Sequence, residues 1–305
     1  MNKILVIGAS GFVGRHVART LLADGYSTRC LARNPSKVQD LATAGCEVVQ
    51  GDMSDLASMR HALESVQAAY ISVHTLSPQH ANTAGQGFME VEMNGLRNIV
   101  TASRAHGVRR LIYVTSLGIT PDGPSAWVRG RWETEQFLLE SGLDVTIIRP
   151  GQIVGVGGQG FNMMVGQAKS RVAVVLGSGR LKMRNIALDD LVSYLVGVLN
   201  DPRAYGQIYD VGCDEILTTD QMIDIAAEVL GRPHPIKMHV PRALLGALAP
   251  LIERLSKFPR GSVKGLLDGL VIDLIGDPLP IRSILPRPPL SYRQAVERAL
   301  TKEKS

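Results

Sequence analysis

Short apolar runs alternate with longer segments of helical periodicity through the first half of the chain. The apolar runs occupy residues 4–7, 28–32, 47–49, 69–73, 111–115 and 145–148, and the helical segments occupy residues 11–24, 35–44, 56–65, 90–106 and 128–141. Strands that read as continuous apolar runs are buried on both faces, and regular alternation with helices indicates a parallel sheet covered on both sides. The pattern therefore predicts a doubly wound α/β fold.

The pattern becomes looser after Pro150-Gly151. It predicts strands near residues 171–175 and 207–211, and helices after the glycines of residues 155–160, near 188–199 and near 219–230, the last capped within 218–220. We therefore expect two domains: residues 1–150 form the sheet domain, and residues 151–305 form a smaller α/β substrate lobe with a helical tail. The tail, residues 241–275, mixes apolar and basic residues. We expect it to pack onto the lobe, with contact to a membrane surface as the alternative.

Composition and charge exclude several classes of protein. Of the 305 residues, 45% are hydrophobic and 20% are charged, which excludes a disordered chain, a collagen and a disulfide-stapled miniprotein. The net charge of +5 is small, and no basic cluster alternates with aromatic residues. We therefore expect no nucleic-acid partner, and a small anionic ligand fits the charge at least as well.

The cysteines and the amino-terminal segment bear on metals and on location. Cys30, Cys46 and Cys213 show no CxxC or Cys/His spacing, so we expect neither a metal site nor a disulfide framework. The apolar run within residues 1–11 is too short for an export signal, and no run reaches the roughly 18 apolar residues of a membrane-spanning helix. The sequence therefore predicts a cytoplasmic protein.

A glycine-rich turn follows the first predicted strand directly. Residues 3–7 form that strand, Gly8, Gly11 and Gly14 follow at intervals of three, and helical spacing resumes at residue 13. Gly8 would allow a tight turn, Gly11 would let the backbone approach a diphosphate, and Gly14 would let the helix lie close to the strand. The start of the helix would offer N–H groups and a positive dipole end to the anion. The turn therefore predicts a dinucleotide site.

This glycine spacing resembles that of the extended and atypical short-chain dehydrogenase/reductases, and the resemblance covers about residues 1–230. It implies a Rossmann-type fold that binds NAD(P). NAD-binding sites usually carry Asp or Glu at the end of the second strand, where the carboxylate binds the ribose 2′-hydroxyl. Here Arg33 stands at that end, with Lys37 nearby. Since a guanidinium binds a 2′-phosphate and a carboxylate repels it, we expect NADP(H) to be preferred over NAD(H).

The resemblance also implies which residues surround the rest of the cofactor. Asp52 and Met53 would recognise adenine, although capping by Ser54 or Asp55 is an alternative explanation of this polar turn. Residues 73–75 would pass the nicotinamide ribose, and residues 149–153 would line the nicotinamide. The predicted cofactor-binding residues are Gly8, Ser10, Gly11, Phe12, Val13, Gly14, Arg33, Lys37, Asp52, Met53, Val73, His74, Thr75, Thr115, Arg131, Pro150, Gly151, Gln152 and Ile153.

The catalytic positions depart from the family pattern. The family carries Ser or Thr at the end of the fifth strand, here Thr115-Ser116, and Tyr-x-x-x-Lys on the next helix, where this chain has Trp127 and Arg131. An indole has no ionisable hydroxyl and arginine does not relay protons, so reduction with a tyrosine acid is not expected. Ser116 is predicted to hydrogen-bond the substrate, and Arg131 to hold the ribose or a developing negative charge. His74 is a candidate proton donor, although we favour a structural role for it.

Taken together, these motifs are similar to those of the NmrA-like, atypical branch of the superfamily, and they leave two functions open. The first is an NADP(H)-dependent oxidoreductase that acts on an apolar small molecule, as Met163, Met164, Leu244 and Leu248 suggest. The second is a redox sensor or assembly factor that binds the cofactor without turnover and acts through a partner protein. Trp127 in place of the tyrosine favours the second. The sequence leaves the oligomeric state open.

Overall fold

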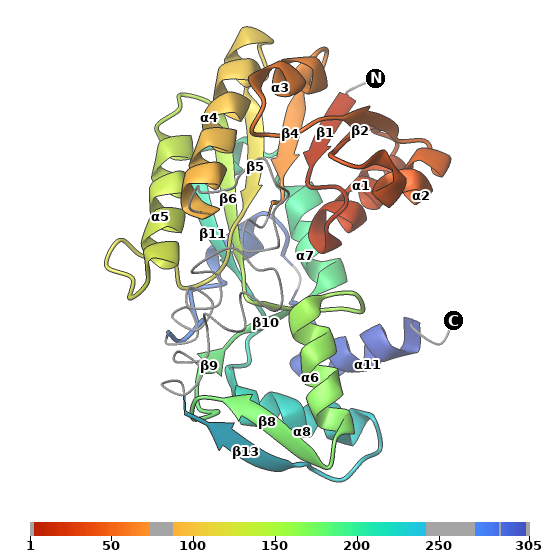
Figure 1. Ribbon diagram of the computed structural model, residues 1–305, viewed down its shortest axis with the longest axis vertical. Helices are drawn as coiled ribbons and strands as arrows, with labels where there is room; N and C mark the ends of the chain where they lie inside the picture. The colour runs from red at the N-terminus through yellow and green to blue at the C-terminus, as the bar shows by residue number, and fades with distance from the viewer. Residues whose placement is uncertain (1–2, 74–87, 242–271, 287, 303–305) are drawn as a thin grey trace. The chain divides into compact units, whose positions relative to one another are not determined.

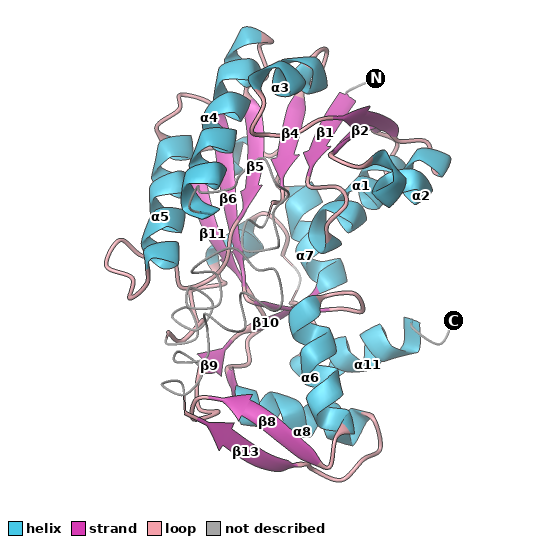
Figure 2. Ribbon diagram, viewed as in Figure 1, coloured by secondary structure: helices cyan, strands magenta, loops and turns pink. Residues whose placement is uncertain are grey.

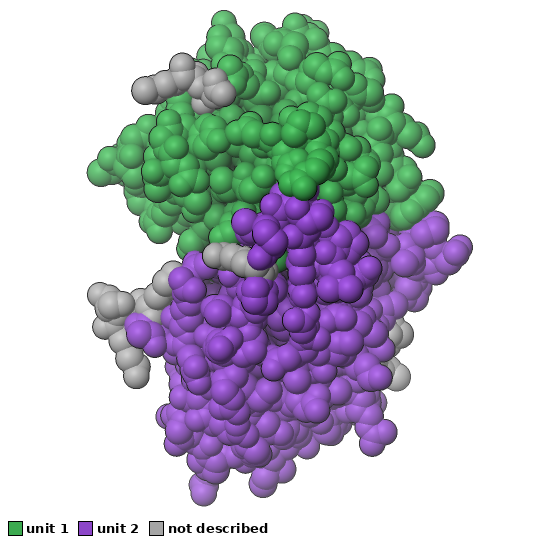
Figure 3. Space-filling model, turned by 180° about the vertical axis from the view of Figure 1, so that it is seen from behind, with its two compact units in different colours: residues 1–115, 130–148, 192–209 green, residues 116–129, 149–191, 210–305 purple. Residues whose placement is uncertain are grey.

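The chain folds into two compact units (Figure 3). The computed structural model describes residues 3–73, 88–241, 272–286 and 288–302. Unit 1 comprises Met1–Thr115, Gly130–Ile148 and Val192–Tyr209, and unit 2 comprises Ser116–Arg129, Arg149–Leu191 and Asp210–Ser305. These units differ from the predicted division at residue 150, because residues 192–209 belong with the first unit and residues 116–129 with the second.

A seven-stranded sheet forms the centre of unit 1 (Figures 1 and 2). Its order is β3-β2-β1-β4-β5-β6-β11, and the neighbours from β3 to β6 all pair in parallel. The strands are β1 (Lys3–Ile7), β2 (Ser27–Ala32), β3 (Glu47–Gln50), β4 (Ala68–Ile71), β5 (Arg110–Val114), β6 (Asp144–Pro150) and β11 (Gln207–Val211). The predicted Rossmann-type, doubly wound fold is therefore confirmed. The order reverses at β1 and β4, which is where ligands bind in open parallel sheets.

The strand at residues 207–211 was predicted correctly but assigned to the wrong part of the fold. It was expected in the smaller lobe, whereas β11 extends the large sheet beside β6. The backbone N–H of Gly206 donates to the carbonyl of Val145 at 2.7 Å, which fixes the start of β11 against β6. Such a pairing joins segments about sixty residues apart, so local periodicity carries no signal for it.

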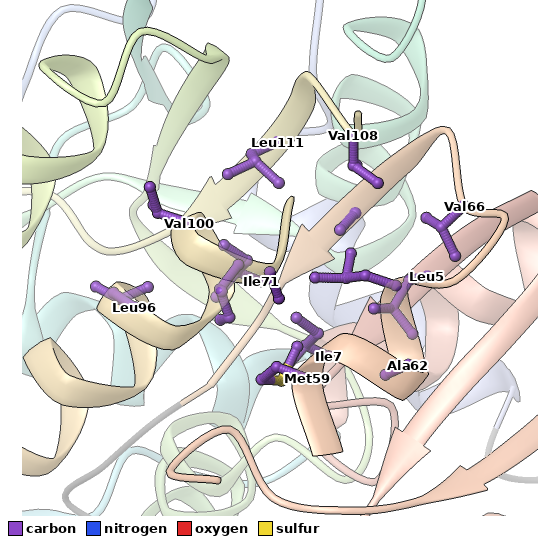
Figure 4. Close-up of a cluster of buried hydrophobic side chains, with 14 of the residues drawn as sticks. Leu5, Ile7, Met59, Ala62, Val66, Ile71, Leu96, Val100, Val108 and Leu111 are labelled. Atoms are coloured by element: carbon purple, nitrogen blue, oxygen red, sulfur yellow. The ribbon is translucent and has the colours of Figure 1, made fainter. Parts of the chain in front are cut away.

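Helices cover both faces of the sheet. They are α1 (Phe12–Ala23), α2 (Gln39–Thr43) after the 3₁₀ turn η1 (Pro35–Val38), α3 (Leu56–Leu63), α4 (Phe88–Ala105), α5 (Ala126–Leu139) and α7 (Leu188–Gly197). One core cluster joins α3, α4 and α5 to one face of the strands (Figure 4). On the other face the hydroxyl of Tyr70 donates to the carbonyl of Leu195 at 3.0 Å, and Val17 and Leu21 of α1 are buried. Burying each such aliphatic side chain stabilises the fold by about 1.5–3 kcal/mol.

Unit 2 contains the predicted smaller α/β region. Three two-stranded sheets pair β7 (Gln152–Val154) with β10 (Asn185–Ala187), β8 (Val172–Leu176) with β13 (Ile236–Val240), and β9 (Lys182–Met183) with β12 (Leu217–Thr218). The helices α6 (Gln159–Lys169), α8 (Thr219–Val229) and α11 (Tyr292–Lys302) share one apolar core with β8. The predicted cap is confirmed, because the Thr218 hydroxyl accepts from the N–H of Gln221 in a full capping box.

Two predictions fall partly or wholly outside the described residues. Most of the segment 241–275, expected to pack onto unit 2 or to contact a membrane, lies in the range 242–271. His74, Thr75, Leu244 and Leu248 also lie outside the described ranges. Within the described part of the chain, no helix is both long and apolar enough to cross a bilayer.

Candidate cofactor site

The glycines after β1 hold the start of α1 close to the strand. Gly8 adopts a φ of +92°, and a Cβ there would lie 2.0 Å from the carbonyl oxygen of Ser72. The N–H of Gly11 donates to the carbonyl of Gly8 at 2.9 Å and closes the turn. A Cβ on Gly14 would lie 2.4 Å from the same carbonyl oxygen. A larger residue at position 8 would therefore push the turn away from the chain after β4, and one at position 14 would push the helix away from the turn.

The start of α1 suits an anion. Its N-cap is Gly11, which offers no capping side chain, and its first turn contains no acidic residue. Ser10 and Gly11 are exposed, whereas Phe12 and Val13 are half-buried. The first N–H groups of a helix have no partner within the helix and lie at its positive end. These residues therefore fit the diphosphate of a dinucleotide, which would accept hydrogen bonds from this turn.

Two basic side chains follow β2, the strand that pairs with β1. Arg33 directly follows β2, and 53% of its side chain is exposed. Its Nε lies 4.0 Å from Oδ2 of Asp52. Lys37 is exposed on η1, and the loop before it is shaped by Asn34, whose Oδ1 accepts from the N–H and hydroxyl of Ser36 at 3.0 and 2.8 Å. The end of β2 thus presents cations where an NAD-binding site presents a carboxylate.

The polar turn after β3 contains two acids with different roles, Asp52 and Asp55. Asp55 is the N-cap of α3 and accepts from the N–H groups of Ala57 and Ser58, each at 3.1 Å, so capping explains Asp55. It does not explain Asp52, whose Oδ1 is held by the N–H and hydroxyl of Ser54, both at 2.9 Å. The carbonyl of Met53 accepts from Nδ2 of Asn98 at 3.0 Å. This turn is therefore fixed beside Arg33.

The structure brings four of the predicted segments to one edge of the sheet. The turn at Gly8, Arg33, Asp52 and Val73 follows β1, β2, β3 and β4 respectively, and these four strands are parallel neighbours. A Cβ on Gly8 would lie 3.5 Å from Cγ1 of Val73, so these two segments are in close contact. The edge beside β1, where the strand order reverses, therefore carries the predicted diphosphate, ribose and adenine residues.

A buried hydrogen bond fixes the residue at the end of β5. The hydroxyl of Thr115 donates to Oε1 of Glu135 on α5 at 2.6 Å, and Glu135 is fully buried. A hydroxyl whose single proton is directed at a carboxylate keeps its lone pairs as acceptors. Thr115 is therefore set up to accept a hydrogen bond rather than to donate one.

Arg131 lies inside a buried polar cluster between α4, β5 and α5. Its side chain is 3% exposed, and Nη1 lies 3.0 Å from Oε1 of Glu92 and 3.1 Å from the hydroxyl of Tyr113. The Tyr113 hydroxyl donates to Glu92 and lies 3.2 Å from Oγ1 of Thr134. Burial raises the pKa of Tyr113 well above its usual value, so this phenol stays protonated. The prediction that Arg131 holds the ribose or an oxyanion stays a prediction, and its ion pair with Glu92 argues for a structural role.

The remaining predicted residues belong to unit 2. The Ser116 side-chain oxygen is buried and has no hydrogen-bond partner among the described residues. The N–H of Gly151 donates to Val211 and that of Gln152 to Arg184, both at 2.9 Å, which fixes the chain after Pro150. Ile153 lies on β7, paired with Ile186. In the described residues no group of three or more His, Cys, Asp and Glu side chains is placed to hold a metal.

The comparison with known families identifies the family of this chain. A family model described as NAD(P)H-binding matches residues 8–202, which include the glycine turn, Arg33 and the buried cluster. The chain belongs to the NAD(P)H-binding family. Within it, the chain is an atypical short-chain dehydrogenase/reductase.

Three similar proteins illustrate the range of this NAD(P)H-binding family. Sterol demethylase protein B of Methylococcus capsulatus is 28% identical over 84% of this chain and 83% of its own length. Ceramide reductase of Caulobacter vibrioides is 29% identical over 87% of this chain and 84% of its own. The crystal structure of the NADPH-dependent quinone oxidoreductase QOR2 of Escherichia coli, complexed with NADPH, matches with a TM-score of 0.75 and 22% identity, over 97% of this chain and 99% of that one.

Four of the buried residues around Arg131 and Thr115 in this NAD(P)H-binding protein were not predicted as site residues from the sequence: Glu92, Tyr113, Thr134 and Glu135. On α5 the buried positions Val128, Arg131, Thr134, Glu135 and Leu138 recur at spacings of three and four residues. That spacing placed Arg131, Thr134 and Glu135 on the apolar face of the helix, and was the available signal for a buried polar cluster. Their partner Glu92, on another helix, had no signal in the local pattern.

Proposed function

We propose that this protein is an NADPH-dependent reductase whose substrate is an apolar, lipid-like carbonyl compound. The preference for NADPH depends on one observation, the half-exposed Arg33 at the end of β2, with exposed Lys37 on the next turn. The 2′-phosphate of NADPH would accept charge-assisted hydrogen bonds from these cations. Two relatives that align with more than four-fifths of the chain are named for a ceramide and a sterol, which supports an apolar substrate.

The structure gives the side chains suggested for the substrate different environments. Met163 is 59% exposed, whereas Met164 is 7% exposed and belongs to the core of unit 2. Met164 is therefore a packing residue, and Met163 alone of the described pair is accessible to an apolar ligand. The relatives, rather than a methionine stripe, support the substrate class that we propose.

Thr115 and Ser116, which follow β5, have different roles in the proposed reaction. NADPH would supply the hydride. The Thr115 hydroxyl donates to Glu135, so Thr115 is an acceptor. Ser116 is the next residue, and its hydroxyl has no hydrogen-bond partner among the described residues, so it is the donor that we assign to the substrate carbonyl. Its removal would leave the developing negative charge of the reduced carbonyl with one fewer donor.

Cofactor selectivity is tested by the variant Arg33→Ala. A hydrogen bond between charged groups contributes about 1.5–3 kcal/mol, so NADPH should bind roughly 10–150-fold more weakly, while NADH binding should change little. Fluorescence titration with each cofactor measures both affinities. Arg60→Ala, which removes an exposed arginine on α3, is the matched control and should leave both unchanged. Equal losses for NADPH and NADH in Arg33→Ala would refute the assignment.

Turnover is tested with NADPH and a series of ketones and quinones of increasing chain length, followed by NADPH absorbance. Consumption should rise with chain length, and Ser116→Ala should lower kcat by about 100-fold, as loss of one oxyanion donor does elsewhere. NADPH affinity should be unchanged in that variant. An unchanged kcat would remove Ser116 from the mechanism.

A second candidate function is a cofactor sensor that binds NADPH without turnover. The observation that favours it is the ion pair between Arg131 and Glu92, which engages a guanidinium that does not relay protons. Trp127, in place of the tyrosine, has no ionisable hydroxyl either. Saturable NADPH binding with no consumption by any acceptor would favour the sensor. Steady consumption that depends on Ser116 would exclude it.

A further inference from the structure

The outer face of the β8–β13 sheet is apolar and exposed. The two strands are parallel, with Ile236 opposite Val172 and Met238 opposite Val174 (Figure 2). These four side chains are 73%, 46%, 50% and 40% exposed, in the same order. We call them the apolar stripe. Because successive residues of a strand point to opposite faces, the four lie together on one face.

On the opposite face of the same sheet, β8 already packs into the core of unit 2. Ala173 and Val175, which alternate with the two stripe residues of β8, are buried against α6 and α8. A sheet with one buried face normally presents polar side chains on the other. Of the eight large apolar side chains that are exposed in the described ranges, four belong to the stripe. Scattered exposed apolar residues are ordinary, whereas a contiguous set marks an interaction surface.

Cations lie at the end of the sheet where both strands begin. Lys169 and Arg171, just before β8, and Arg232, before β13, are all exposed. Nη1 of Arg232 donates to the carbonyl of Lys169 at 2.9 Å, and the N–H of Ile236 donates to the carbonyl of Arg171 at 3.0 Å. The three basic residues are therefore grouped beside the stripe.

The nearby acids are engaged with other bases. Glu228 of α8 is bonded by Arg293 and by Nε2 of His234, the latter at 2.9 Å. Asp224 accepts from Nζ of Lys237 at 2.6 Å. These two carboxylates therefore neutralise bases other than Lys169, Arg171 and Arg232. The region beside the stripe presents the positive charge of those three residues.

We propose that the apolar stripe and its three cations dock this protein onto an anionic membrane surface. Short apolar side chains that enter the boundary between headgroups and acyl chains, flanked by lysine and arginine, are the arrangement that binds a protein in the plane of an anionic bilayer. The charge selects this occupant over an apolar protein groove, which would not need the cations. The inference rests on the proposed function to the extent that a lipid-like substrate would be drawn from that bilayer.

The test is sedimentation of the full chain with vesicles of phosphatidylcholine alone or with one-third phosphatidylglycerol, without cofactor or substrate. Wild-type protein should bind the anionic vesicles and be released by high salt, because salt screens the attraction to the surface. The variant Ile236→Asp/Met238→Asp should bind at least tenfold more weakly. Leu279→Asp, a change at an exposed apolar residue elsewhere in unit 2, is the matched control and should bind as the wild type does.

A second variant separates docking from misfolding. Arg171→Gln leaves every stripe side chain in place and should weaken binding to anionic vesicles about fivefold, with no change in thermal stability. Absence of wild-type binding to anionic vesicles, or unchanged binding in the double variant, would overturn the proposal. So would stripe-dependent dimerisation without vesicle binding, which would assign the stripe to a second copy of the chain.

The membrane inference and the proposed function fail in different measurements. Turnover is measured with the full series of ketones and quinones and no vesicles, and docking with vesicles and no cofactor. Vesicle binding without turnover would leave the docking face in place and refute the reductase. Turnover without vesicle binding would refute the docking face alone.

Discussion

Replacing Glu92 with glutamine should destabilise unit 1 strongly. Glu92 and Arg131 are 0% and 2% exposed, and their nearest atoms lie 3.0 Å apart. Burial acts to lower the pKa of Arg131, but the Glu92 carboxylate and the Tyr113 phenol outweigh it and raise the pKa of the guanidinium. Because arginine stays protonated in proteins whatever its partner, Glu92→Gln would leave the Arg131 charge in place without its closest counterion.

The size of the effect follows from the burial of both partners. Removing one member of a buried ion pair costs about 3–5 kcal/mol, because the remaining charge stays buried without the partner that compensated it. For a unit of this size 1 kcal/mol corresponds to roughly 2–4 °C, so Glu92→Gln should lower Tm by about 6–20 °C. Glu90→Gln, an exposed position on the same helix, is the matched control and should stay within about 0.5 kcal/mol of wild type.

Urea and thermal unfolding of the cofactor-free protein measure this loss, and a double-mutant cycle assigns it to the pair. Arg131→Gln alone should cost about as much as Glu92→Gln. The double variant should lose clearly less free energy of unfolding than the sum of the two single losses, because neither charge of the pair remains. A loss below about 1 kcal/mol in Glu92→Gln, or additive losses in the double variant, would refute the argument. A selective loss of NADPH affinity in Arg131→Gln, with stability unchanged, would restore the predicted ribose role.

Two further predictions concern the amino-terminal half of the sheet. Gly14→Ala should lower the free energy of unfolding by about 1–3 kcal/mol and weaken NADPH binding, because its Cβ would lie 2.4 Å from a carbonyl oxygen. Its control is Gly166→Ala on α6, where the Cβ meets open space and should raise the free energy of unfolding by up to about 1 kcal/mol. Thermal unfolding with and without NADPH measures both, and effects of equal sign would count against the packing argument. Cys46 should be alkylated at lower pH than Cys30. The Cys30 thiol donates a hydrogen bond to the Cys46 sulfur at 3.4 Å, which lowers the pKa of Cys46. The same hydrogen bond, together with burial, raises the pKa of Cys30. Peptide mass spectrometry after iodoacetamide treatment between pH 6 and 9 measures this order, and Cys30→Ala should shift the alkylation of Cys46 to higher pH.

The first strand, turn and helix could be predicted from the sequence because every determinant is local. The glycines at positions 8, 11 and 14 act on neighbours within a few residues, and the structure places the turn as the spacing predicted. The parallel pairing of β1 to β6 could be predicted for a similar reason, since short crossovers through helices favour parallel neighbours. The position of β11 could not be predicted, because it depends on contacts with β6 across a long intervening segment.

The site illustrates the same limit. Aligning α5 with the family motif identified Arg131 as the residue in place of the lysine, but the motif says nothing about Glu92, which lies on α4 and pairs with it. A single arginine at a helical spacing is compatible with an exposed ligand site and with a buried ion pair. Only the packing of α4 against α5 distinguishes the two.

The buried cluster also explains how a chain without the usual tyrosine can keep a defined geometry at the end of β5. Tyr113 and Thr115 point to the same face of the strand, where Glu92 and Glu135 accept hydrogen bonds from their hydroxyls. These hydrogen bonds fix the end of β5 against α4 and α5, but they also engage the hydroxyl protons that a catalytic acid would donate. A reductase built on this arrangement must therefore draw its proton from outside the cluster, and Ser116, the next residue along the chain, carries the nearest hydroxyl in the sequence that these bonds do not engage.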